Sequence, residues 1–170
     1  AVAVGVGEEL LAIAHQATGR NAEFQMSHTG GAVAHIEHLC NNEATRALVM
    51  ETEPWGYDSS NKFLNLGIAI ETTLESQALL AHLLDIEKRI SIGAHRDEKG
   101  NYIDRQIDID LIAVDDIIID TPQLQLPHPR MHLRDFVLIP MLQLNAEWRH
   151  PILNKTIIQL LHHLNEERDK

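Results

Sequence analysis

Two aspartates, Asp108 and Asp110, stand in the stretch DRQIDIDL, which covers residues 104–111. In a β-strand the side chains alternate between two faces, so Ile107, Ile109 and Leu111 would share one face and the two aspartates the other. Carboxylates held that close repel each other unless a cation lies between them. Magnesium suits such a pair, because it binds through one or two carboxylates together with substrate phosphates. The alternative is an exposed strand edge that carries acidic residues and no ligand.

Three side chains could bind a phosphate near this pair. Arg105 lies three residues before Asp108, so alternation puts it on the opposite face, although it could still reach a phosphate from the start of the strand. His128 lies between two prolines, in a stiff loop that presents one imidazole, and Arg134 follows six residues later. A planar guanidinium binds phosphate well. Taken singly, each residue also fits an ordinary surface position.

A second group of residues could bind a flat heterocycle. Trp55 lies in the loop EPWG (residues 53–56), and Phe63 and Asn65 follow in an alternating stretch. Aromatic rings offer stacking area, and one amide offers both a donor and an acceptor. The alternative is a loop that packs Trp55 onto the core.

The composition limits the class of protein. The 170 residues fit one domain, and shares of 44% hydrophobic and 23% charged residues are ordinary for a globular protein. A net charge of −11 argues against nucleic acid or a membrane surface as partner. The opening lacks a basic leader, and the lone Cys40 suits a cytoplasmic location. The later histidines, including His162 and His163, are interpreted as surface residues.

The elements that must position these residues follow from hydrophobic spacing and breaker residues. Strands are predicted at residues 1–6, 44–52 and 63–72 and around Asp108. Helices are predicted from Thr73, as the cap, to Ile90, and at residues 132–144 and 154–167, with a new turn or a kink at Pro140. A hairpin across Asp115 and Asp116 should lead into residues 117–119. The order βαββαβ predicts an α+β, ferredoxin-like fold, with helices covering an antiparallel sheet in an α/β/α sandwich.

Four motifs in this chain resemble those of one enzyme family. They are ETEPWG at 51–56, KFLN at 62–65, DRQIDID at 104–110 and LPHPRMHLRDFVLIP at 126–140. In this order and near this spacing they are similar to the 6-hydroxymethyl-7,8-dihydropterin pyrophosphokinase family. The resemblance covers about residues 44–160, and residues 1–43 match poorly. It implies one pyrophosphokinase domain over residues 1–170.

The resemblance implies an activity and its partners. Members transfer pyrophosphate from ATP to the hydroxymethyl group of the pterin and release AMP, in folate biosynthesis. By similarity, Asp108 and Asp110 would hold two magnesium ions that bridge the ATP phosphates. The partners would then be small molecules, ATP and the pterin, and the protein would act as a monomer without nucleic acid or membrane.

The resemblance also implies a role for each matched residue. The residues expected at the reacting phosphates are Arg105, Asp108, Asp110 and His128. The residues expected to bind the nucleotide are Glu87, Arg105, Leu111, His128 and Arg134. The residues expected around the pterin are Thr52, Glu53, Trp55, Phe63, Asn65 and Phe136, with the two phenylalanines sandwiching the ring.

Two departures from the family pattern keep other functions open. The first strand ends in Val6-Gly7-Glu8-Glu9, where members usually have Gly-Ser-Asn or Gly-Thr-Asn, and Ser91-Ile92-Gly93 replaces a usual Gly-Arg. A catalytically weakened module that binds pterin or nucleotide is therefore one alternative. A different two-metal enzyme, such as a nucleotidyl transferase, is another.

Overall fold

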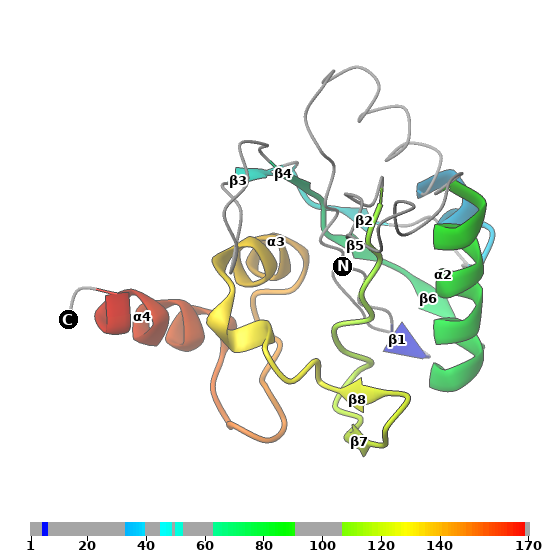
Figure 1. Ribbon diagram of the computed structural model, residues 1–170. Coiled ribbons are helices and arrows are strands. Elements are labelled where there is room, and N and C mark those ends of the chain that lie inside the picture. Colours follow the sequence, from blue (N-terminus) through cyan, green and yellow to red (C-terminus); the bar gives the residue numbers. More distant parts are fainter. Residues whose placement is uncertain are drawn as a thin grey trace, which may run out of the picture.

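The structure is a computed structural model that describes residues 5–6, 33–39, 45–48, 50–52, 63–90 and 107–168 (Figure 1). Its strands are β1 (Gly5–Val6), β2 (Thr45–Arg46), β3 (Met50–Thr52), β4 (Phe63–Asn65), β5 (Ile68–Ala69), β6 (Glu71–Thr72), β7 (Ile119–Asp120) and β8 (Gln125–Leu126). Its named helices are α2 (Ser76–Ile90), α3 (Asp135–Leu144) and α4 (Ile157–Arg168), with a 3-10 turn at Met131–Leu133. A short helix also covers residues 33–37.

Strand pairing in the described part of the chain is mostly antiparallel. β2 pairs with β5, β3 with β4 and β7 with β8 in that sense, whereas β1 and β6 are parallel. The described part of the chain thus contains helices together with small, mostly antiparallel strand pairs. The α+β class predicted from the sequence is confirmed at this level.

The strands predicted at 44–52 and 63–72 are each divided into shorter pieces, which corrects the expectation of two continuous strands. Gly67 lies in the break between β4 and β5, where α3 comes close to the backbone. A Cβ added at Gly67 would lie 2.6 Å from Cβ of Pro140. The Gly67 carbonyl accepts a hydrogen bond from the N–H of Ala47, 2.8 Å away. The chain around Gly67 therefore stays hydrogen-bonded to the chain around Ala47 across this break.

Helix α2 begins later than predicted. Thr73 is not its cap, because the N–H of Leu79 donates to the carbonyl of Glu75 at 2.9 Å and the helix starts at Ser76. Its inward face is formed by Leu79, Leu83 and Ile86 at helical spacing, as amphipathic periodicity requires. Helical spacing in the sequence predicted Leu79, Leu83 and Glu87 on this face, and all three are buried, but it also included Leu84, which is 42% exposed, and it missed Ile86. The buried face of α2 was thus predicted in part, and its first turn was not.

The acidic stretch alternates in burial as predicted. Ile107, Ile109 and Leu111 are 1%, 3% and 4% exposed, whereas Asp108 and Asp110 are half-buried. Residues 107–110 have no assigned strand, and Leu111 forms only an isolated bridge. The alternation of faces is thus confirmed, while a regular strand is not seen over these residues.

The turn after this segment differs from the predicted hairpin. Asp115 has a φ of 46°, and the N–H of Ile117 donates to the carbonyl of Val114 at 2.9 Å, so a turn does form here. However, β7 pairs with β8 and not with the segment before the turn. The indole N–H of Trp148 donates to the Asp115 carbonyl at 2.8 Å and holds the turn against the C-terminal part of the chain.

Two hydrophobic clusters meet at the acidic segment. Ile109 and Leu111 belong to the cluster under α2, whereas Ile112 and Ala113 belong to the cluster between α3 and α4. Burial on both sides fixes the backbone that carries the two aspartates. The helices predicted at 132–144 and 154–167 are confirmed as α3 and α4, and Pro140 lies within α3.

Among the described helices, none has the length and apolar composition needed to cross a membrane.

Candidate active site

One cleft of about 330 Å³ collects five of the predicted site residues. They are Glu87 from α2, Asp108, Asp110 and Leu111 from the acidic segment, and His128 from the loop after β8. The connection between β7 and β8 forms a further wall. Segments from three parts of the chain thus bring these side chains to one place.

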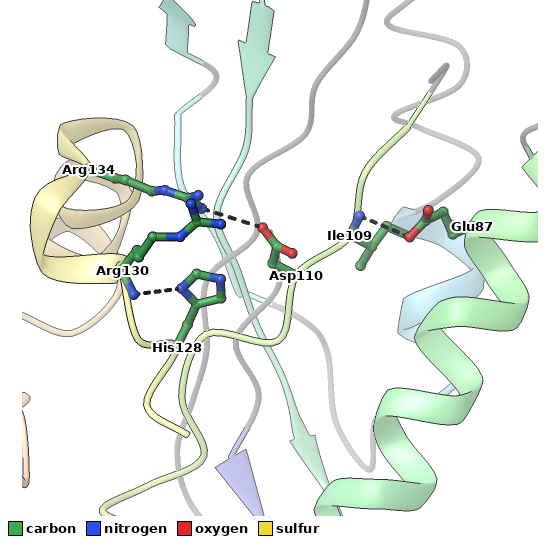
Figure 2. A network of polar contacts seen from close by, with 6 residues as sticks. All are labelled: Glu87, Ile109, Asp110, His128, Arg130 and Arg134. Carbon is green, nitrogen blue, oxygen red and sulfur yellow. Dashed lines mark hydrogen bonds and ion pairs between the residues drawn. The ribbon is translucent and has the colours of Figure 1, made fainter. Parts of the chain in front are cut away.

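The acidic segment is tied to α2 at its centre. Glu87 is only 8% exposed, and its Oε2 accepts a long hydrogen bond from the N–H of Ile109 at 3.5 Å (Figure 2). Ile109 lies between Asp108 and Asp110, so this contact bears on the backbone that separates them. Glu87 thus lines the cleft and also helps to fix the acidic pair.

His128 is held to the same segment by its backbone. Its N–H donates to the carbonyl of Ile112 at 2.6 Å, and its Nδ1 accepts from the N–H of Arg130 at 3.2 Å (Figure 2). Burial lowers the pKa of His128, Asp110 opposes this, and Arg134 and Arg130 lower it further. The ring is therefore neutral at pH 7, and because Nδ1 is an acceptor, Nε2 carries the proton and can donate.

Arg134 connects the acidic pair to an aromatic ring. Its Nη1 lies 3.9 Å from Oδ2 of Asp110, and its guanidinium carbon lies 5.7 Å from the centre of the Phe136 ring. Burial lowers the pKa of Arg134 and Asp110 raises it, but an arginine stays charged in a protein. Figure 2 shows Arg134 and Arg130 on one side of Asp110, with His128 below. A positive charge therefore faces the predicted metal site.

The acidic pair fits a metal that is shared with a substrate. No group of three or more metal-binding side chains is found within the residues that the structure describes. Magnesium typically uses one or two carboxylates and takes its other ligands from phosphates and water. Asp108 and Asp110, both half-buried and both lining the cleft, supply that number of carboxylates.

The predicted pterin residues are placed only in part. Thr52 and Phe63 are partners in the β3–β4 pairing, and Asn65 of β4 is 3% exposed. The N–H of Leu48, just before β3, donates to Oε1 of Gln143 in α3, the helix whose first turn contains Phe136. The predictions for Glu53, Trp55, Arg105 and the loop at 91–103 lie outside the described residues.

Residues 16–146 match the family described as 7,8-dihydro-6-hydroxymethylpterin-pyrophosphokinase (HPPK). The chain belongs to this family. Among its relatives is the 2-amino-4-hydroxy-6-hydroxymethyldihydropteridine pyrophosphokinase of Aquifex aeolicus, 30% identical over 86% of this chain and 89% of the relative. Those of the same name from Porphyromonas gingivalis and Bacillus subtilis are 33% and 32% identical, covering 83% and 78% of this chain and 95% and 77% of the relatives. The resemblance drawn from the four motifs is thereby confirmed.

In this pyrophosphokinase family member, the sequence interpretation misplaced one histidine. His162 and His163 are exposed as expected, but His150 is only 4% exposed. Its Nδ1 accepts from the N–H groups of Ile152 and Leu153, both at 3.2 Å. Burial lowers the pKa of His150 to about 4. The only signal for this in the sequence is its position close to Trp148, before a proline.

Proposed function

We propose that this protein transfers pyrophosphate from ATP to the hydroxymethyl oxygen of 6-hydroxymethyl-7,8-dihydropterin, giving AMP and the pterin diphosphate. The observation that supports this most directly is the cleft that combines Asp108, Asp110 and His128, with the Arg134 guanidinium 3.9 Å from Asp110. Membership of a pyrophosphokinase family supports ATP and the hydroxymethylpterin as the substrates of this cleft.

In this proposal Asp108 and Asp110 hold two magnesium ions, whose chemistry is to neutralise phosphate charge. Arg134 binds phosphate oxygens from the side opposite the two aspartates. The Nε2–H group of His128 donates a hydrogen bond to a further phosphate oxygen. Glu87 keeps the acidic segment in position through Ile109. The protein contributes mostly orientation and electrostatic stabilisation, since phosphoryl-type transfer needs little covalent help.

The two organic groups bind on either side of the phosphates. The apolar part of the cleft, with Leu80, Leu111 and Leu124, suits adenine, and the backbone of Leu111 would meet its edge. The pterin would lie near β3, β4 and the start of α3, bound by Thr52, Glu53, Trp55, Phe63, Asn65 and Phe136. Arg105 would add a further contact to the triphosphate.

The finer architecture belongs to the same proposal. A ferredoxin-like arrangement of the strands would bring β3, β4 and the acidic segment to one sheet. The protein would work as a cytoplasmic monomer on small molecules alone. The family relationship and the mostly antiparallel pairing support this arrangement.

The test is incubation of the protein with ATP, magnesium and 6-hydroxymethyl-7,8-dihydropterin, followed by separation of the nucleotides. AMP and pterin diphosphate should form in equal amounts. A weakened binding module would bind both ligands, measured by calorimetry, without AMP release. A nucleotidyl transferase would instead release free pyrophosphate and transfer the AMP group, which would contradict the proposal.

A further inference from the structure

A second cavity of about 360 Å³ lies behind the loop that carries His128. Its apolar lining comes from the β7–β8 hairpin, from the following loop and from the turn before α4: Ile118, Ile119, Leu126, Pro127, Ile152 and Leu153. In Figure 1 the hairpin and that turn project from the same end of the molecule. We call this space the rear cavity. Its size and mainly apolar lining fit a small organic ligand.

The charged groups at the rear cavity do not favour an ionic ligand. Among the described residues that line it, Asp120 is the only charged one, and it is exposed. Its Oδ1 already accepts a hydrogen bond from Nε2 of Gln125 at 2.8 Å. The Asp120 carboxylate would repel an anionic ligand. A cationic ligand would gain little binding energy from a carboxylate in contact with water.

Besides Asp120 and Gln125, the polar part of the lining consists of two imidazoles. The rings of His132 and His150 are perpendicular, with centres 6.3 Å apart, and Trp148 packs edge-on against His150 at 5.7 Å. Burial lowers the pKa of both histidines, so both rings are neutral at pH 7. Nδ1 of His132 is buried and has no hydrogen-bond partner among the described residues.

We propose that the rear cavity binds a small uncharged aromatic molecule that carries one hydroxyl or N–H group, of the phenol or indole class. The edge-to-face arrangement of the existing rings can be extended by one more ring. The single polar group of the ligand would form its hydrogen bond with the imidazole pair. The apolar residues named above would cover the rest of the ligand.

Occupation of the rear cavity also bears on the active-site cleft, a step that rests on the proposed function. The loop between β8 and the 3-10 turn separates the two spaces: Pro127 lines the rear cavity, His128 lines the cleft, and Pro129 lines both. A ligand that binds this loop conformation favours it over others. Because that conformation directs His128 into the cleft, the ligand should tighten nucleotide binding.

Binding at the rear cavity can be tested with 2-naphthol by calorimetry, which needs no turnover. The wild-type protein should bind one equivalent saturably. Ile152→Trp places a large side chain at the cavity and should weaken binding at least tenfold. Ile158→Trp is the matched control, because Ile158 is equally exposed, at 59%, but does not line the cavity. Absence of saturable binding, or equal binding by both variants, would overturn the proposal.

Coupling to the cleft is tested by titrating ATP and magnesium, without pterin, at rising 2-naphthol concentrations. ATP affinity should rise several-fold and then level off, and by linkage ATP should raise the naphthol affinity by the same factor. A steady loss of ATP affinity would mean that naphthol occupies the nucleotide cleft, and this would refute the rear cavity as its site. An unchanged ATP affinity would refute the coupling. If the protein forms no AMP but still binds naphthol, the proposed function fails and the cavity assignment stands.

Discussion

Nη1 of Arg134 lies 3.9 Å from Oδ2 of Asp110, a residue 24 positions earlier in the chain. This approach joins the start of α3 to the acidic segment. A cation bound at Asp110 and the guanidinium of Arg134 would therefore both contact the same anionic group of a ligand, such as the phosphates of a nucleotide. The predictions below begin with these two residues.

Asp110→Asn should abolish most of the activity and leave the fold unchanged. The amide has nearly the shape of the carboxylate but lacks the charge that a magnesium ion requires, and the residue is half-buried at the edge of the cleft. We expect AMP formation to fall by about 100-fold or more. Asp108→Asn should behave alike. Asp116→Asn, an exposed acid in the next turn, is the control, and near-normal rates in the Asp110 variant would refute the metal assignment.

Arg134→Lys should lower kcat/KM by about 10-fold or more, since an ammonium group cannot bind phosphate in two places or lie flat near the Phe136 ring. The control is Arg89→Lys in α2, where the exposed arginine forms an ion pair with Asp85. Steady-state kinetics with each substrate varied would measure this. Equal effects of the two substitutions would show that Arg134 has no special part in binding.

Phe136→Ala should weaken pterin binding much more than ATP binding. The ring is half-buried at the start of α3 and would stack on the pterin, while the nucleotide lies on the side of Leu111. Calorimetry with each ligand alone gives the two affinities. Leu133→Ala, three residues earlier and 37% exposed, serves as the control for loss of apolar area. Equal losses for pterin and ATP would exclude the stacking role.

His150 should make stability fall as the pH drops from 6.5 towards 4. Its pKa in the folded state is about 4, below the ordinary value of 6.5, so the unfolded chain binds more protons in this interval and acid favours unfolding. The contribution is at most about 3 kcal/mol. His150→Asn keeps an acceptor for the two backbone N–H groups but does not titrate. Urea unfolding at several pH values gives the free energy of unfolding as a function of pH. Between pH 6.5 and 4 this free energy should fall less steeply in His150→Asn than in the wild-type protein, and as steeply as in the wild-type protein in His162→Asn.

Gly67→Ala should destabilise the protein by about 1–3 kcal/mol, because the new methyl group would lie 2.6 Å from Cβ of Pro140. Pro140 is buried inside α3 and cannot turn away. Thermal unfolding followed by circular dichroism would measure the loss. A melting temperature within one degree of the wild-type value would mean that α3 shifts away from the sheet without cost.

The sequence predicted most reliably those features that depend on neighbouring residues. Alternation from Ile107 to Leu111 was enough to assign the more and the less buried face, and helical spacing identified Leu79 and Leu83 as inward-facing residues of α2. The four motifs identified the family and, with it, five residues that the cleft brings together. The first two inferences use only local order, which the sequence displays directly, whereas the gathering of the cleft residues followed from the family resemblance.

Features that depend on distant contacts were not predictable from such patterns. The break between β4 and β5 lies at Gly67, where α3 packs close to the backbone. The pairing of β7 with β8 accompanies a turn at Asp115 that Trp148 holds from 33 residues away. The burial of His150 likewise depends on surroundings that only the folded chain supplies. In each case the deciding partner has no periodic relation to the residue concerned.

The parallel pairing of β1 with β6 has a consequence for how the chain is made. Gly5 and Val6 align with Glu71 and Thr72, so the first strand cannot find its partner until that later stretch has left the ribosome. At roughly 5–20 residues per second, synthesis of the stretch between the two strands takes about 3 to 13 seconds, during which the backbone of β1 is without its strand partner. During that time the nascent chain is open to chaperones, and pauses in translation before residue 71 would prolong its exposure to aggregation.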